Sequence, residues 1–173
     1  MNKHQQSPGA ILESSFGFRL PPAMHLEFEG LLAPDNKLTP EDINEFFCRE
    51  YIENTTPFEL TTVNFEKEFI NTDRERLCCT ARVIHDEKEQ EITGIGNGTI
   101  DSLLNAFKTH FQIDFEMLDY LQHGLTQGSQ ALAASYIQLQ DKEGNIFWGV
   151  GIDSDCTLSA VRALLSALNR SQR

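Results

Sequence analysis

Basic residues are scarce in this sequence, which narrows the range of possible partners. Lysine and arginine total 14 against 26 aspartates and glutamates, giving a formal net charge of -12 at pH 7. A nucleic-acid-binding face needs clustered lysine and arginine, and an anionic membrane surface attracts the same residues. The charge balance therefore argues against nucleic-acid and membrane partners and favours a soluble, cytoplasmic protein.

Long apolar runs are also missing. No run approaches the roughly 20 residues that a membrane-spanning helix needs. The first ten residues, MNKHQQSPGA, are polar and lack the hydrophobic segment of a signal peptide. Without a secretory signal we expect reduced thiols at the four cysteines, which are Cys48, Cys78, Cys79 and Cys156.

Motifs for metal binding or nucleophilic catalysis are absent as well. The sequence has no Cys-x-x-Cys pair and no two histidines at metal-ligand spacing. It has no Gly-x-Ser-x-Gly elbow and no phosphate-binding P-loop. The residues therefore predict no metal site, no cofactor and no catalytic residue in this chain.

The N-terminal third predicts a small helical subdomain. Residues 1–14 lack periodicity, and we expect a disordered lead-in there. Within residues 15–56, Pro21 and Pro22 can open one helix, and Thr39 is a typical N-cap for a second. Two helices this short cannot form a core of their own, so they need a partner surface. Their apolar positions are Met24, Phe28, Leu31, Leu32, Ile43, Phe46, Phe47 and Tyr51.

From Pro57 onward the apolar pattern has a period of two, which indicates strands. Residues 76–84, 111–117 and 146–152 alternate most clearly, and residues 60–70, 89–95 and 131–140 alternate more weakly. Residues 141–145, with the sequence DKEGN, predict a hairpin turn. Two helices, beginning near Gly98 and Asp155, interrupt the strands; their apolar stripes are Ile100, Leu103, Leu104, Phe107 and Phe111, and Leu158, Val161, Leu165 and Leu168.

The order of these elements predicts a duplicated βββα unit. Three strands lead to Gly94-Ile95-Gly96 and a helix, and three more lead to Gly149-Val150-Gly151 and a second helix. On this alignment the connector in the second copy is a few residues longer. Each helix can cover one face of its sheet, so residues 57–173 predict an α+β domain whose uncovered surfaces favour a dimer.

The run Gly94, Gly96 and Gly98 allows three interpretations. A dinucleotide fingerprint needs Gly-x-Gly-x-x-Gly between parallel strands, and the spacing here is Gly-x-Gly-x-Gly. The glycines can instead permit close packing at a strand-to-helix bend. Alternatively, backbone N–H groups at the helix start can hold a carboxylate. In the second copy, Asp153 and Asp155 disfavour an anion and suit an ammonium group.

Five segments together resemble a known family. EITGIGNGTIDSLLNAF, MLDYLQHGL, GSQALAASYIQL and FWGVGIDSDCTLSAVRALLSALNR are similar, in order and spacing, to the C-terminal regulatory domain of 2-isopropylmalate synthases. FGFRLPPAMHLEF looks like the linker subdomain that joins this domain to the catalytic barrel. FWGVG and the closing SALNR are most similar to the actinobacterial and fungal branch.

The resemblance implies a regulatory role without catalysis in this chain. In the family, a metal-dependent (β/α)8 barrel condenses acetyl-CoA with 2-oxoisovalerate, and this chain contains none of the barrel. What carries over is feedback inhibition by leucine at a homodimer of regulatory domains, acting on a barrel in cis.

The resemblance also implies an effector site, position by position. The GNG segment and the helix start, the LDY segment, the GSQALAA segment and the last glycine-rich loop supply it. Small residues would leave space for an isobutyl side chain, lined by Ile100, Tyr120 and Cys156. The full set is Gly96, Asn97, Gly98, Ile100, Asp101, Leu118, Tyr120, Gly124, Ala131, Ala134, Ile152 and Cys156.

Two alternatives stay open. The domain can be an assembly module that dimerises and has no effector. It can also sense isoleucine for a citramalate synthase, because one methylene in an apolar pocket changes binding by only about 1–3 kcal/mol.

Overall fold

The computed structural model describes residues 6–32, 38–71, 74–125, 128 and 131–173. None of the helices in these ranges is long and apolar enough to cross a membrane. The elements, in chain order, are α1 (Pro8–Ile11), η1 (Leu12–Phe16), α2 (Pro22–Leu31), α3 (Pro40–Tyr51), β1 (Glu59–Asn71), β2 (Arg74–His85), β3 (Lys88–Gly96), α4 (Thr99–Phe111), β4 (Phe115–Gly124), β5 (Ala133–Asp141), β6 (Ile146–Asp153) and α5 (Cys156–Arg170).

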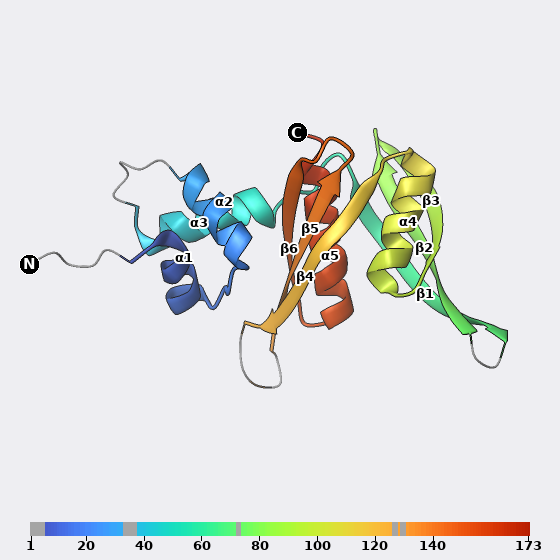
Figure 1. Cartoon of the computed structure of the whole chain (residues 1–173), viewed down its shortest axis with the longest axis horizontal. Helices are drawn as coiled ribbons and strands as arrows, with labels where there is room; N and C mark the ends of the chain where they lie inside the picture. Colours follow the sequence, from blue (N-terminus) through green and yellow to red (C-terminus); the bar gives the residue numbers. More distant parts are fainter. Residues whose placement is uncertain (1–5, 33–37, 72–73, 126–127, 129–130) are drawn as a thin grey trace, which may run out of the picture.

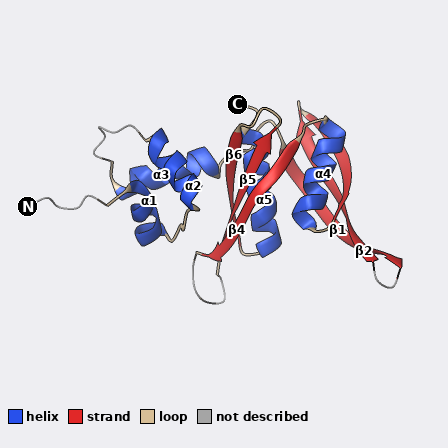
Figure 2. Cartoon of the chain, in the orientation of Figure 1, coloured by secondary structure: helices blue, strands red, loops and turns tan. Residues whose placement is uncertain are grey.

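The strands form two antiparallel three-stranded sheets, in the orders β1-β2-β3 and β4-β5-β6. Helices α4 and α5 lie side by side between the two sheets, and helices α1–α3 lie beyond the β4-β5-β6 sheet (Figures 1 and 2). Each sheet is followed in the chain by its covering helix, so the predicted α+β fold with two βββα units is confirmed.

The two units align with a constant offset of 57 residues. A Cβ on Gly94 would overlap the backbone of Ser102 and Ala106, and a Cβ on Gly151 would overlap the backbone of Ser159 and Ala163. Gly94 therefore corresponds to Gly151, and the N-caps Gly98 and Asp155 keep the same offset. The predicted equivalence of Gly94 and Gly149 is wrong, and so is the longer second connector. The positions where each helix crosses its sheet show that Gly94 is equivalent to Gly151.

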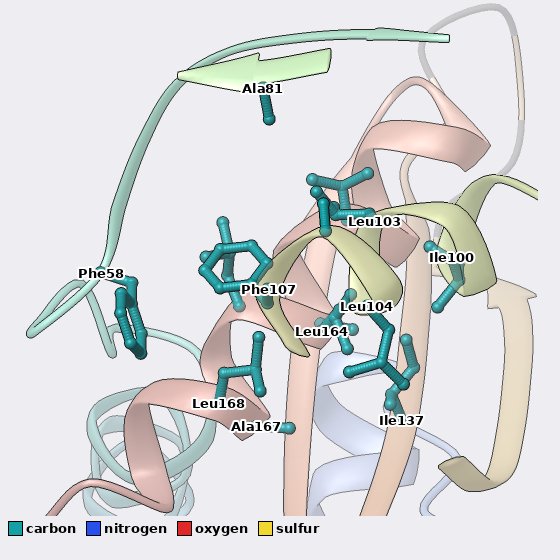
Figure 3. Close-up of a cluster of buried hydrophobic side chains, with 14 of the residues drawn as sticks. Phe58, Ala81, Ile100, Leu103, Leu104, Phe107, Ile137, Leu164, Ala167 and Leu168 are labelled. Atoms are coloured by element: carbon teal, nitrogen blue, oxygen red, sulfur yellow. The ribbon is translucent and has the colours of Figure 1, made fainter. Parts of the chain in front are cut away.

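The core of the body lies between the sheets. Leu103, Phe107, Leu164 and Leu168 from the two helices are fully buried there, and Figure 3 shows the helices meeting through these side chains. The sheets contribute inward-facing positions at two-residue spacing, as alternation predicts. Those positions are Cys79, Ala81, Val83, Ile92, Ile137 and Leu139.

A second core joins the helical subdomain to the outer face of the β4-β5-β6 sheet. Tyr136, Trp148 and Val150 are buried on that face, against Phe28 and Phe47 of the helices. The expectation that the short helices need a partner surface is confirmed. The N-cap expected at Thr39 is also confirmed: its hydroxyl accepts from the Asp42 N–H, and the Asp42 carboxylate accepts from the Thr39 N–H.

The lead-in and one strand differ from the expectation. Pro8–Ile11 is helical, and Leu12 is fully buried in the second core, so the expected disorder does not hold from Pro8 to Ser14; residues 1–5 lie outside the described residues. Phe111 ends α4 and is not in a strand, because its ring packs on Phe107 one turn earlier. Gln112 then adopts a left-handed conformation (φ 54°), and β4 begins only at Phe115.

Candidate functional site

Five predicted site residues lie where β3 meets α4: Gly96 ends β3, Asn97 and Gly98 form the turn, and Ile100 and Asp101 lie in the first turn of α4. A Cβ on Gly96 would overlap Asp101 and Ser102, so this glycine allows close packing. Gly98 is the N-cap of α4 and has extended backbone (φ -155°). A Cβ added to Gly98 would have no neighbouring atom within 4 Å. Of the three interpretations, close packing therefore applies to Gly94 and Gly96, and only Gly98 borders open space.

The start of α4 already has a carboxylate of its own. Asp101 Oδ2 accepts from the Asn97 N–H at 2.8 Å. Asn105 Nδ2 donates to the Ile95 carbonyl at 2.9 Å and lies 3.4 Å from Asp101 Oδ1. A ligand carboxylate at this helix start would therefore share its donors with Asp101 or displace it.

A small charged cleft of about 230 Å³ opens beside this turn. Asn97, Gly98 and Thr99 line one side of it, and Leu77 and the charged residues Lys67, Glu75 and Arg76 line the other. Lys67 lies 3.3 Å from Glu75, and both side chains are more than half exposed. At this distance and exposure Lys67 and Glu75 form only a weak ion pair. Both charged groups are therefore accessible to a small polar ligand.

The equivalent turn between β6 and α5 has two acidic residues. Asp155 caps α5 by accepting from the N–H groups of Thr157 (2.7 Å) and Leu158 (3.0 Å). Asp153 accepts from the Asp155 N–H and from Arg162, both at 3.0 Å. These two contacts, the backbone N–H first, hold the pKa of Asp153 below its usual value. An ammonium ligand would compete with Arg162 for this carboxylate.

Strand β4 carries two further predicted residues, Leu118 and Tyr120. Tyr120 pairs with Ile137, on the face of the sheet that carries α5, and Ile137 shares a buried cluster with Ile100 (Figure 3). Leu118 and Tyr120 remain 44% and 43% exposed. Tyr120 therefore lies on the sheet face that covers the core to which Ile100 belongs, whereas Leu118 lies at a register shift between Met117 and Asp119.

A partly buried polar cluster joins β4 to the start of α5. Gln122 Nε2 lies 2.8 Å from Ser135 Oγ, 3.0 Å from Ser159 Oγ and 2.8 Å from the Cys156 carbonyl oxygen. The hydroxyls of Ser135 and Ser159 are 2.6 Å apart. No motif in the sequence marked Gln122, Ser135 or Ser159 as site residues. The offset of 57 residues between Ser102 and Ser159 was the available signal.

The remaining predicted residues lie at the same end of the β4-β5-β6 sheet. Gly124 pairs with Ala133, and Ala134 pairs with Ile152. Ala134 is fully buried in the second core, on the sheet face away from α5, whereas Ala131 and Cys156 are exposed. Ile152 borders a separate cleft of about 430 Å³ between β1, β6 and the side of α5. The structure thus brings several residues of the set to one end and places Ala134 and Ile152 behind the sheet.

Across the described ranges, no three His, Cys, Asp or Glu side chains cluster as a metal ion would require. The starts of α4 and α5 lie at the same end of the body, at the bottom of Figure 1, beside an edge strand with exposed apolar side chains. These features define a small α+β domain of two βββα units with exposed apolar side chains on one edge strand.

Comparison with known proteins identifies the family. Residues 37–172 match the sequence model of the LeuA allosteric (dimerisation) domain, and the chain belongs to this family. It is 34% identical over 168 residues to the 2-isopropylmalate synthase of Clostridium acetobutylicum, covering 94% of this chain and 30% of that protein.

Two further relatives are also 2-isopropylmalate synthases. The Helicobacter hepaticus protein is 33% identical over 168 residues, covering 92% of this chain and 30% of that protein. The Bifidobacterium longum subsp. infantis protein is 48% identical over 88 residues, covering 49% of this chain and 14% of that protein. The chain therefore spans about 30% of the length of the relatives that match nearly all of it. The family expected from the sequence motifs is confirmed.

Proposed function

We propose that this domain binds leucine and thereby inhibits a 2-isopropylmalate synthase barrel in the same protein. The observation that carries the proposal is the match to an allosteric domain family over residues 37–172. The arrangement of Gly98, Ile100 and Tyr120 supports it. Gly98 offers open backbone at a helix start, Ile100 lies in the first turn of that helix, and Tyr120 lies on the sheet face that covers the same core. Backbone N–H groups would take the leucine carboxylate, and the apolar side chains its isobutyl group.

We further propose that the domain acts as a homodimer and that β4 contributes to the interface. Four large side chains of this edge strand, Met117, Leu118, Tyr120 and Leu121, are between 37% and 44% exposed. Tyr120 and Leu121 lie on opposite faces of the sheet, and apolar side chains on both faces of an unpaired edge strand favour association with another chain. Because Leu118 and Tyr120 are also predicted effector residues, a second copy would cover the effector.

In this proposal the chemistry lies outside this chain. The condensation of acetyl-CoA with 2-oxoisovalerate, and its divalent metal, would belong to the barrel of the longer protein. The chain itself would carry no metal and no cofactor, and the whole protein would work in the cytoplasm.

Calorimetric titration of the purified chain with leucine, isoleucine and valine tests the proposal. Leucine should bind, and at 100 times its Kd it should stabilise the chain by about 2.7 kcal/mol. Tyr120→Ala should weaken binding at least tenfold. Asp114→Asn is a control away from the site and should leave leucine binding unchanged. Asp114 is exposed and forms ion pairs with Lys108 and Lys142 beyond the far end of α4.

Other results would select an alternative. Tighter binding of isoleucine than leucine would point to a citramalate synthase. A folded dimer with no response to any of the three amino acids would leave an assembly module. One observation favours this last alternative: Asp101 already occupies a donor at the start of α4.

A further inference from the structure

The last turn of α5 contacts the end of α3 and the linker through buried polar side chains. Asn169 is fully buried; its Nδ2 donates to the carbonyls of Asn54 (2.7 Å) and Phe58 (2.9 Å), and its Oδ1 accepts from the Phe58 N–H at 2.8 Å. Ser166 Oγ donates to the Tyr51 carbonyl at 2.5 Å. These bonds fix the segment from Tyr51 to Phe58 against residues more than 100 positions later in the chain.

Arg170 extends these contacts to three other elements. Its guanidinium lies 3.1 Å from Glu27 on α2 and 2.9 Å from Glu50 on α3, and it donates to the Trp148 carbonyl on β6 at 2.6 Å. It also lies over the Tyr51 ring, 4.2 Å from the centroid. The Arg170 side chain is only 10% exposed. A planar guanidinium can make these contacts together, whereas an ammonium cannot.

The charges at this contact balance. Glu50 also lies 3.3 Å from Arg173, so two carboxylates face two guanidinium groups. The Tyr51 hydroxyl donates to Glu27 at 2.9 Å, and burial, followed by the Glu27 charge, raises the pKa of Tyr51. Removing Arg170 would leave the Glu27 and Glu50 carboxylates with Arg173 as the one remaining cation. Helices α2 and α3 would then lose the ion pairs that join them to α5.

We propose that Ser166, Asn169 and Arg170 form a clamp that makes the helical subdomain move with α5. These residues belong to the SALNR segment that closes α5. Helix α5 spans 15 residues, or about 22 Å. It begins at Cys156, beside the candidate effector residues, and ends at the clamp. A change at its start can therefore reach the linker and helices α2 and α3 as a rigid displacement. That leucine binding causes a change at the start of α5 rests on the proposed function. The contacts of the clamp do not depend on it.

A competing explanation is that apolar packing alone holds the helical subdomain. Phe28, Phe47 and Trp148 are buried between the helices and the sheet. If that packing is sufficient, loss of Arg170 leaves the docking of α2 and α3 unchanged. The two explanations differ in where hydrogen exchange changes and not only in overall stability.

Hydrogen exchange of the full chain, read by mass spectrometry, separates them. In Arg170→Met, amides of α2, α3 and residues 52–58 should exchange at least tenfold faster, while amides of α4 and β1–β3 stay within twofold. Arg170→Lys should restore the pattern only in part. Arg49→Met is the matched control, since Arg49 is exposed on α3 and contacts the Phe46 ring.

The clamp is overturned if Arg170→Met behaves like Arg49→Met, or if exchange accelerates equally throughout the body. If Arg170→Met does not fold, Ser166→Ala is measured by the same criterion, because it removes the two hydrogen bonds of the hydroxyl, to the Tyr51 carbonyl and from Asn54 Nδ2, and little volume.

A second arm adds saturating leucine. In the unsubstituted chain, exchange in residues 52–58 and α3 should slow; in Arg170→Met, leucine should bind within threefold of the original Kd without this slowing. Equal slowing in both chains would overturn transmission through the clamp. If no amino acid binds, the proposed function fails, while the ligand-free comparison still decides the clamp.

Discussion

Gly151 lies directly beneath Ser159, so closely that a Cβ on the glycine would overlap the Ser159 carbonyl oxygen and the Ala163 nitrogen. Gly94 has the same relationship to Ser102 and Ala106 in the first unit. Both obstacles are helix backbone, which cannot move aside by a rotamer change. These two contacts set the distance between each helix and its sheet.

Gly151→Ala should therefore be strongly destabilising. Inserting a methyl group into a well-packed contact costs typically 1–3 kcal/mol, and we expect at least the upper end because backbone must shift. Urea unfolding followed by circular dichroism measures this. Gly98→Ala is the control, since nothing lies within 4 Å of its added Cβ. It replaces the glycine N-cap of α4 by a less favoured residue, which should lower the free energy of unfolding by no more than about 1 kcal/mol. Equal effects of the two substitutions would contradict the packing role.

The N-cap of α3 should make the stability of the chain depend on pH in the acid range. The Thr39 N–H, followed by the Thr39 hydroxyl, holds the pKa of Asp42 below its usual value. A lowered folded-state pKa means that this stabilisation is present above about pH 5 and is lost as pH falls toward 2. The difference in unfolding free energy between the original chain and Asp42→Asn should shrink over that window.

Glu41→Gln is the control for this effect, because it removes a carboxylate from the same turn and leaves the Thr39–Asp42 hydrogen bonds in place. Its difference from the original chain should vary less with pH than that of Asp42→Asn. A pH-independent difference for Asp42→Asn would show that the capping box does not act through the ionised carboxylate.

The exposed residues of β4 should control self-association. Leu118→Ser and Tyr120→Ser should each raise the dimer dissociation constant at least tenfold, since one buried large apolar side chain contributes about 1.5–3 kcal/mol. Sedimentation equilibrium gives the constant directly. Leu26→Ser is the matched control: Leu26 is 73% exposed on α2, away from β4. Dimers of unchanged strength in the β4 variants would place the interface elsewhere.

Removing the helical subdomain should expose an apolar surface. A chain of residues 57–173 would present Tyr136, Trp148 and Val150 to solvent, all of which are almost fully buried in the intact chain. We expect it to bind a hydrophobic dye and aggregate. Adding Trp148→Gln and Val150→Thr should reduce both effects. A truncated chain that stays monodisperse without dye binding would refute the dependence of the sheet on the helices.

Local patterns in the sequence predicted the elements well, because each pattern has a local cause. Alternation predicted the strands at 76–84 and 146–152, and Thr39 and Asp155 marked helix starts through their own side-chain hydrogen bonds. Phe111 shows the limit: it fits both a helical and a strand pattern, and only its contact with Phe107 decided between them.

The sequence by itself thus determined the element types, the two βββα units and the family, since periodicity, caps and motif order depend on residues close together in the chain. Only the tertiary structure decided that Gly94 and Gly151 are equivalent positions of the repeat and that Ala134 lies behind the sheet. It also decided that Arg170 contacts Glu27, Glu50 and Trp148. The physical reason is distance along the chain. These contacts join residues that share no local pattern, and they form only when helices and sheets pack against one another.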